Sequence, residues 1–318
     1  MRRALLIGIN DYDNSPLNGC VNDAEKMANI LATHENEERN FDCQLYVSDH
    51  DDDERINKRE LKTKICELFE QPADVALLYF SGHGSLDSLG AGGYLVSQEL
   101  DGIPMLEVLK IANDAKTKIN EIVIILDCCH SGSMGANMLS NSEQAIISEG
   151  VSILTASRTS QYAMEAAGSG VFTSLIHDAL DGGAADALGN VTAASIYAYA
   201  DQALGAWDQR PLFKSHVSKL LPIRKCKPKA SLATIRKLNI YFPDPHEHFQ
   251  LDPSFEPDEG HGDKEKEEIF KNLQRLRSAG LVEPIGEEHM YYAAVNSKKC
   301  KLTALGRFYW SLANQGRL

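Results

Sequence analysis

The chain has 318 residues, of which 43% are hydrophobic and 24% charged, as in a globular protein with one large domain and a small one. No apolar run is longer than a strand, and the apolar start over residues 1–8 is too short for a signal peptide, so we expect no membrane segment. The net charge of −13 makes nucleic acid an unfavourable partner for the whole molecule. Seven cysteines without a C-x-x-C pair argue against a disulfide framework and against structural zinc, so we expect no metal, no cofactor and a reducing, cytoplasmic location.

Up to about residue 222, short apolar runs alternate with amphipathic stretches at helical spacing. The runs predict strands over residues 4–9, 44–47, 75–80, 121–126, 151–156 and 211–217. The amphipathic stretches predict helices over residues 22–31, 57–69, 104–112, 171–180 and 193–204. This alternation indicates an α/β fold, in which a mostly parallel sheet is covered by helices on both faces. Ligands of such sheets bind at the carboxyl ends of the strands.

Residues 223–263 differ in composition from the preceding chain and predict a linker. Six basic residues fall within 224–237, and four prolines lie among acids and histidines within 242–263. His246, His248 and His261 could bind a metal there together with Asp244 and Glu247, but a solvated polar loop is the favoured interpretation.

Residues 264–318 predict a separate small domain. A helix is expected to end at Gly280, residues 291–295 and 300–302 to pair as a hairpin, and residues 305–312 to return as a helix. This order resembles a winged helix-turn-helix domain. Residues 263–318 hold ten Lys or Arg and seven Asp or Glu, so DNA binding is an alternative, although the stretch expected to read bases offers few polar side chains. A protein-docking module that recruits a partner or activator is the favoured interpretation.

Two short strings carry the chemistry of the chain. Residues 79–84 read Tyr-Phe-Ser-Gly-His-Gly, and residues 125–132 read Ile-Leu-Asp-Cys-Cys-His-Ser-Gly. They place His83 and Cys129 at the ends of two predicted strands, 46 positions apart. A thiol needs a base or a cation beside it to attack a carbonyl at neutral pH. Alone, the histidine would be an ordinary turn residue and the cysteine an ordinary core residue, but together they favour a catalytic dyad.

Residues 1–222 resemble the caspase fold of cysteine peptidases, in the metacaspase and bacterial caspase-like (orthocaspase) branch. The resemblance rests on both strings, on residues 4–9 and 17–24, and on Tyr12. The caspase pattern also puts its histidine roughly 50 residues before its cysteine. The resemblance implies that Cys129 is the nucleophile and that His83 protonates the leaving amine. It further implies an oxyanion hole formed by the N–H groups of Gly84 and Cys129.

The family's substrate pocket corresponds to Cys20, Asp23, Ser81 and Asp127 in this chain. Two carboxylates there would pair with Arg or Lys and repel Asp or Glu, so the resemblance implies cleavage after basic residues, with arginine preferred for its bidentate geometry. Asp23 could instead serve as a helix-start residue, and Asp127 could cap the loop after its strand. Residues 85–102 hold only three acids, so we expect no calcium requirement.

Many family members are cut between the cysteine strand and the next strand, but residues 119–157 hold no Lys or Arg. A peptidase of basic specificity would more readily cut itself within 224–237 and release the C-terminal unit. Three alternatives remain open: a silent caspase-fold scaffold, a winged-helix nucleic-acid-binding regulator, and another cysteine peptidase family of the same clan. The resemblance also implies protein or peptide substrates and a role in stress, cell death or defence.

Overall fold

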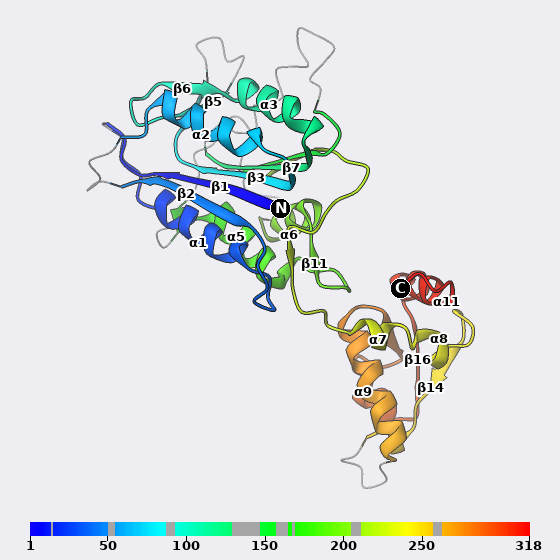
Figure 1. Ribbon diagram of the computed structural model, residues 1–318. Coiled ribbons are helices and arrows are strands. Elements are labelled where there is room, and N and C mark those ends of the chain that lie inside the picture. Colours follow the sequence, from blue (N-terminus) through cyan, green and yellow to red (C-terminus); the bar gives the residue numbers. More distant parts are fainter. Residues whose placement is uncertain are drawn as a thin grey trace. The chain divides into compact units, whose positions relative to one another are not determined.

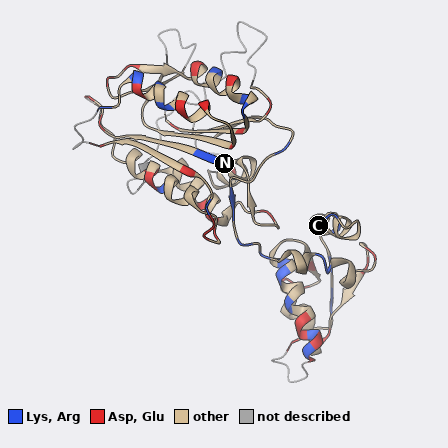
Figure 2. Cartoon of the chain, viewed as in Figure 1, with Lys and Arg blue, Asp and Glu red and all other residues tan. Residues whose placement is uncertain are grey.

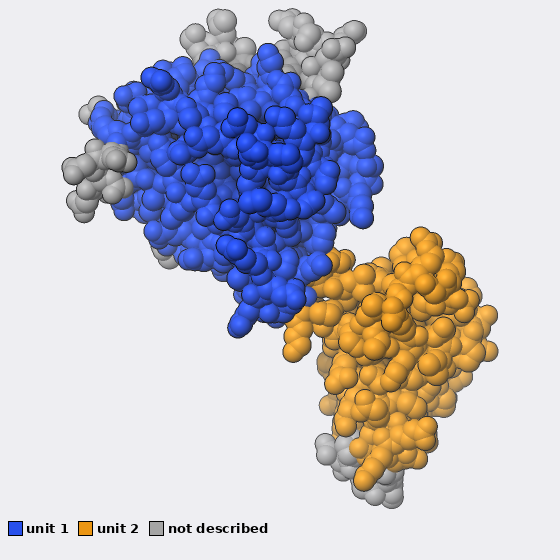
Figure 3. All heavy atoms as spheres, viewed as in Figure 1, with its two compact units in different colours: residues 1–185, 191–226 blue, residues 186–190, 227–318 orange. Residues whose placement is uncertain are grey.

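A computed structural model describes residues 1–13, 15–49, 55–86, 93–128, 147–156, 165–166, 169–204, 211–256 and 263–318. The chain forms two compact units, which are residues 1–185 with 191–226, and residues 186–190 with 227–318 (Figure 3). Among the described residues, no helix has both the length and the apolar character that a membrane span requires.

A six-stranded sheet forms the centre of the first unit, in the order β12–β8–β7–β3–β1–β2. Five strands run parallel, namely β1 (Arg2–Ile9), β2 (Asp42–Ser48), β3 (Ala73–Ser81), β7 (Ile119–Asp127) and β8 (Val151–Thr155). The edge strand β12 (Leu212–His216) is antiparallel to β8. The chain leaves β1 toward β2 on one side and returns to β3 on the other, which makes the β1–β3 boundary a topological switch point. The predicted α/β fold with a mostly parallel sheet is confirmed.

Helices cover both faces of this sheet (Figure 1). One face carries α2 (Lys58–Glu70) and α3 (Met105–Asp114), and the other carries α1 (Cys20–Ala32), α5 (Val171–Asp178) and α6 (Ala193–Leu204). Strand β7 feeds both cores because successive side chains point to opposite faces: Ile124 packs with α2 and α3, whereas Ile125 packs with α1 and α5. Asn57 caps α2 as predicted, in a reciprocal capping box with Glu60.

Helix α1 lies unusually close to β1. A Cβ atom on Gly8 would overlap the carbonyl oxygen of Cys20 and lie 2.9 Å from Cβ of Ala24. Only glycine permits this approach, which brings the first turn of α1 to the carboxyl end of β1.

Short elements complete the first unit. A small antiparallel sheet follows β3 and consists of β4 (Gly84–Leu86), β5 (Gly93–Val96) and β6 (Gly102–Pro104). Two further strand pairs are β9 (Glu165–Ala166) with β10 (Ser169–Gly170), and β11 (Asn190–Val191) with β13 (Arg224–Lys225). Single turns of helix lie at η1 (Ala115–Thr117) and η3 (Ala179–Gly183).

The second unit has its own apolar core, which includes Phe242, Leu273 and Leu281. Its antiparallel sheet has the order β14 (His248–Gln250), β16 (Lys299–Leu302), β15 (Val282–Ile285). Its helices are α7 (Leu232–Ile235), α8 (Leu238–Tyr241), η4 (Pro253–Phe255), α9 (Lys264–Ser278), α10 (Met290–Val295) and α11 (Ala304–Asn314). Basic and acidic residues both occur along α9 (Figure 2).

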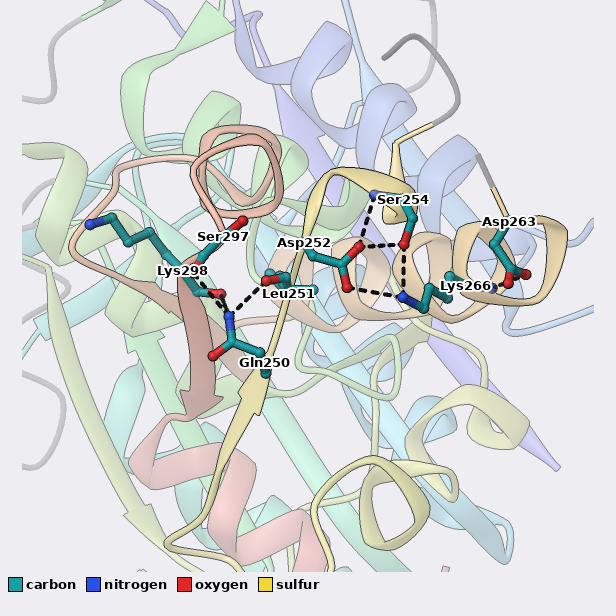
Figure 4. A network of polar contacts seen from close by, with 8 residues as sticks. All are labelled: Gln250, Leu251, Asp252, Ser254, Asp263, Lys266, Ser297 and Lys298. Carbon is teal, nitrogen blue, oxygen red and sulfur yellow. Dashed lines mark hydrogen bonds and ion pairs between the residues drawn. The ribbon is translucent and has the colours of Figure 1, made fainter. Parts of the chain in front are cut away.

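The stretch interpreted as a linker is largely folded. Within 223–263, residues 227–256 form α7, α8, β14 and η4 of the second unit. Figure 4 shows hydrogen bonds that hold this segment to the rest of the second unit. The Gln250 amide donates to the carbonyls of Ser297 (2.9 Å) and Lys298 (3.3 Å). The Lys266 ammonium lies 2.9 Å from Asp252 Oδ2. The prolines and acids of this stretch led to the prediction of a linker. The stretch folds instead because side chains such as Phe242 and Leu251 are buried in the core of the second unit.

The predicted C-terminal hairpin is wrong. Residues 291–295 belong to helix α10, and the partners of β16 are β15 and β14. Met290, Ala293 and Ala294 are buried at helical spacing, while the two exposed tyrosines between them gave the segment a strand-like appearance. The winged-helix assignment stays a prediction.

Candidate active site

The carboxyl ends of β1, β3 and β7 meet at one edge of the sheet. Ser81, the last residue of β3, lies opposite Gly8 of β1 and opposite Asp127 of β7. His83 and Gly84 follow directly, and the Gly82 N–H points to the carbonyl of Asp127 at 3.4 Å. The fold therefore brings four of the predicted site residues, Ser81, His83, Gly84 and Asp127, to the same edge of the sheet.

The turn after β1 holds His83 in a single orientation. His83 Nε2 lies 2.7 Å from the carbonyl oxygen of Ser15. A carbonyl only accepts hydrogen bonds, so Nε2 donates this one and Nδ1 is the ring nitrogen left to face a reacting group. The His83 backbone N–H donates to Tyr12 Oη at 3.0 Å, and the two rings lie 4.5 Å apart. The imidazole is therefore positioned with one basic nitrogen available for proton transfer.

Tyr12 is buried at the centre of this arrangement. Its hydroxyl also donates to the carbonyl of Val96 at 3.1 Å, while the Val96 N–H bonds back to the His83 carbonyl at 3.0 Å. Burial raises the pKa of the Tyr12 phenol well above its usual value, so the hydroxyl stays protonated. A Cβ on Gly82 would lie only 2.5 Å from this hydroxyl, which explains the glycine before the histidine.

The two adjacent cysteines differ in what the structure describes. Cys128 is 1% exposed and packs with Leu126 in the core beneath α2 and α3, so its sulfur is shielded from a substrate. Cys129, the predicted nucleophile, lies outside the described residues, and so does its N–H in the predicted oxyanion hole. The burial of Cys128 supports the choice of the second cysteine of the pair.

The predicted pocket residues Cys20, Asp23, Ser81 and Asp127 are all buried. The two carboxylates converge on Gly170, the residue before α5. Gly170 donates its N–H to Asp23 Oδ2 at 3.0 Å. A Cβ on Gly170 would overlap Asp127 Oδ2 and lie 3.2 Å from Asp23 Oδ2. Asp23 and Asp127 are therefore neighbours, although 104 positions separate them in the sequence.

Cys20 begins α1 beside this pair. Its N–H donates to the side-chain oxygen of Asn10 at 2.9 Å, which fixes the first turn of the helix to the end of β1. Together with the close approach at Gly8, this contact sets the depth at which Asp23 enters the site.

Four residues near the site were missed in the sequence: Tyr12 as a positioning residue, Ser15, Gly170 and Thr173. Ser15 contributes only its backbone carbonyl, which any residue type supplies. Thr173 donates both its N–H (3.2 Å) and its hydroxyl (2.6 Å) to Asp127 Oδ2. For Gly170 and Thr173, the sequence offered one indication, which is a glycine directly before an amphipathic stretch.

The mostly parallel sheet covered by helices agrees with what a comparison with known families finds. Residues 1–222 match the model of the caspase domain, Peptidase_C14. The chain belongs to this family of cysteine-type peptidases.

Two curated relatives and two solved structures agree with this assignment. Metacaspase III c of Phaeodactylum tricornutum is 31% identical over 147 residues, covering 42% of this chain and 43% of the relative. Metacaspase-1 of Plasmodium falciparum is 29% identical over 147 residues, covering 42% of this chain and 24% of the relative. The chain thus spans less than half the length of the curated relatives that it matches.

The solved structures share the fold. Protein GSU0716 of Geobacter sulfurreducens aligns with a TM-score of 0.52 at 17% identity, over 71% of this chain and 99% of that one. Caspase-1 of Spodoptera frugiperda aligns with a TM-score of 0.51 at 14% identity, over 71% of this chain and 90% of that one. The expected caspase-like fold is confirmed.

Proposed function

We propose that this protein is a cysteine endopeptidase that cleaves after arginine, and less readily after lysine, with Cys129 and His83 as its dyad. The observation that carries the proposal is the convergence of Asp23 and Asp127 at the same edge of the sheet as His83. Two buried carboxylates attract a guanidinium or ammonium group and repel an acidic side chain. Arginine is favoured because its planar fork can meet carboxylate oxygens with two hydrogen bonds.

The proposed chemistry follows from the orientation of His83. The Cys129 thiolate attacks the carbonyl carbon of the residue before the scissile bond, and the N–H groups of Gly84 and Cys129 stabilise the oxyanion. His83 Nδ1 accepts the proton of the Cys129 thiol and then delivers it to the leaving amine, while the Ser15 carbonyl holds Nε2 on the opposite side of the ring. Water then hydrolyses the thioester and restores the thiol.

The test is hydrolysis of matched short peptides that end in Arg, Lys, Asp or Ala before a fluorogenic group, with and without calcium. We expect cleavage after Arg without a calcium requirement, loss of all cleavage in Cys129→Ala, and a large rise in KM in Asp127→Asn. Asp178→Asn is the matched control, because Asp178 lies on α5 with a side chain that is 63% exposed. Preference for the Asp peptide, or activity retained in Cys129→Ala, would contradict the proposal.

We further propose a self-cleavage site within the basic stretch 224–237. The Arg224 side chain is buried and donates to the carbonyls of Leu180 (2.9 Å) and Thr33 (3.0 Å), and Arg224 and Lys225 belong to strand β13. The peptide bond after Lys227 precedes a proline, whose ring nitrogen has no N–H.

The bond after Lys229 combines an exposed basic side chain, a backbone outside helix and strand and a following residue other than proline. Arg236 and Lys237 are exposed as well, but they cap the short helices α7 and α8 with helical backbone angles, unlike the extended backbone that a peptidase substrate presents. Lys229–Ala230 is therefore the bond that we expect the enzyme to cut, at the start of the second unit.

The second unit serves, in this proposal, as a docking module for a protein that recruits or activates the peptidase in a stress, cell-death or defence response. Mixed charge along α9 supports protein docking over DNA binding. Measuring DNA affinity at two salt concentrations separates these roles, because tight and strongly salt-dependent binding would favour the regulator instead.

A further inference from the structure

The amino-terminal turn of α5 lies against both pocket carboxylates. Gly170 binds Asp23 through its N–H, and Thr173 binds Asp127 through its N–H and its hydroxyl. Peptide dipoles place partial positive charge at this end of a helix. This helix end therefore favours negative charge on both carboxylates.

The Thr173 side chain continues into a buried chain of hydroxyl groups. Its Oγ1 lies 2.6 Å from Tyr79 Oη, and the Ser81 hydroxyl bonds to the same phenol. An ionised carboxylate only accepts, so Thr173 gives its proton to Asp127 and accepts one from Tyr79. Burial, reinforced by the charges of Asp127 and Asp23, raises the pKa of Tyr79 well above its usual value, so the phenol retains the proton that it donates.

This chain has a direction, from Ser81 to Tyr79 to Thr173 to Asp127. All four side chains are buried, and Thr173 and Tyr79 are fully so. Side chains in such a network have little freedom to rotate, because each alternative orientation leaves a buried polar group without a partner. Asp127 Oδ2 is thus held by Thr173 of α5, whose hydroxyl is in turn held through Tyr79 and Ser81 of β3.

We propose that Thr173 is a positioning residue of the substrate pocket, which holds the Asp127 carboxylate in the orientation that a substrate guanidinium requires. This inference rests on the proposed function, because it assigns Thr173 to the pocket that reads arginine. A guanidinium pairs with a carboxylate through two parallel bonds and depends on that orientation, whereas an ammonium group behaves as a point charge. Thr173 therefore contributes more to the recognition of arginine than to that of lysine.

The experiment compares Thr173→Val, which keeps the side-chain shape and removes the hydroxyl, with Thr173→Ser, which keeps the hydroxyl. For Thr173→Val we expect KM for the arginine peptide to rise about tenfold, the scale of one hydrogen bond to a charged group. We expect a smaller rise for the lysine peptide and a kcat within about twofold of wild type. The inhibition constant of benzamidine, a soluble arginine mimic, should rise in parallel, and Thr173→Ser should restore all three values.

Ser174→Ala is the matched control, because the Ser174 hydroxyl lies in the same helical turn and bonds to the Gly170 carbonyl at 3.1 Å. It should leave KM and benzamidine inhibition unchanged. Alkylation of Cys129 by iodoacetamide and the melting temperature report whether the site and the fold are intact. If Thr173→Val does not fold, Tyr79→Phe removes the preceding donor and should raise KM for arginine about threefold.

Unchanged KM for the arginine peptide in Thr173→Val would overturn the inference while the proposed function stands. So would equal losses for arginine and lysine together with a collapse of kcat, because that result describes a structural defect. A wild-type enzyme that cuts neither arginine nor lysine peptides would overturn the proposed function and this inference together.

Discussion

Replacing Tyr12 by phenylalanine tests whether the turn after β1 positions the catalytic histidine. The substitution keeps the ring that packs on His83 and removes the hydroxyl that accepts the His83 N–H and donates to the Val96 carbonyl. One hydrogen bond contributes a net of about 0.5–1.5 kcal/mol to the free energy of unfolding, so losing two should lower it by about 1–3 kcal/mol.

Tyr12→Phe should also lower kcat about tenfold, because the backbone of His83 loses an anchor while the contact of Nε2 with Ser15 remains. KM for the arginine peptide should stay within about twofold, since the Tyr12 hydroxyl bonds to neither pocket carboxylate. Urea unfolding measures the change in stability, and steady-state hydrolysis separates kcat from KM.

Tyr46→Phe is the matched control, because the Tyr46 hydroxyl lies at the surface, 3.5 Å from Glu60 Oε2. It should change neither stability nor kcat by a measurable amount. Wild-type kcat and unfolding free energy in Tyr12→Phe would refute the positioning role, and a selective rise of KM would place Tyr12 in the substrate pocket instead.

Three further predictions follow from buried or exposed groups described above. Cys128→Ala should keep full peptidase activity and lose about 1 kcal/mol in urea unfolding, because its sulfur fills the core, whereas Cys129→Ala should lose activity alone. Wild-type protein should yield fragments 1–229 and 230–318 by intact mass, and Lys229→Gln and Cys129→Ala should both stay whole; cutting at another bond in Lys229→Gln would contradict the assigned site. Burial raises the pKa of Glu121 despite the nearby charges of Arg2 and Lys116, so the folded protein binds more protons than the unfolded chain just above the ordinary pH range of a carboxyl group. The free energy of unfolding should therefore fall as the pH rises through that range, and Glu121→Gln should flatten the fall, as urea titrations at several pH values would reveal.

Local patterns were sufficient to predict the central sheet of the first unit and the helices that cover it, but not its short additional strands. Strands β3 and β7 are continuous apolar runs because both of their faces are buried. Helix α2 is recognisable in the sequence by its Asn57 cap and by its leucines at helical spacing. His83 and Asp127 could be placed at strand ends because each follows or ends such an apolar run in the sequence. The register that puts Ser81 beside Asp127 is seen only in the folded sheet, because local patterns do not specify which residues of two strands lie opposite.

Residues whose role depends on distant partners escaped prediction. Thr173 looks like any threonine in an amphipathic helix, and only the folded chain puts it against Asp127, 46 positions earlier. In the second unit, α10 was mistaken for a strand because its exposed face carries adjacent tyrosines, whose β propensity outweighed three buried residues at helical spacing. Short helices give too few turns for periodicity to decide.

The second unit is discontinuous in sequence, since residues 186–190 belong to it together with 227–318. Ala187 is one of its core residues, and Leu188 packs against the same core. Breaking the chain after Lys229 would therefore leave two polypeptides that share one hydrophobic core and elute together from a sizing column. Separation would require pulling residues 186–190 out of that core, so scission and release are distinct events with distinct energetic barriers.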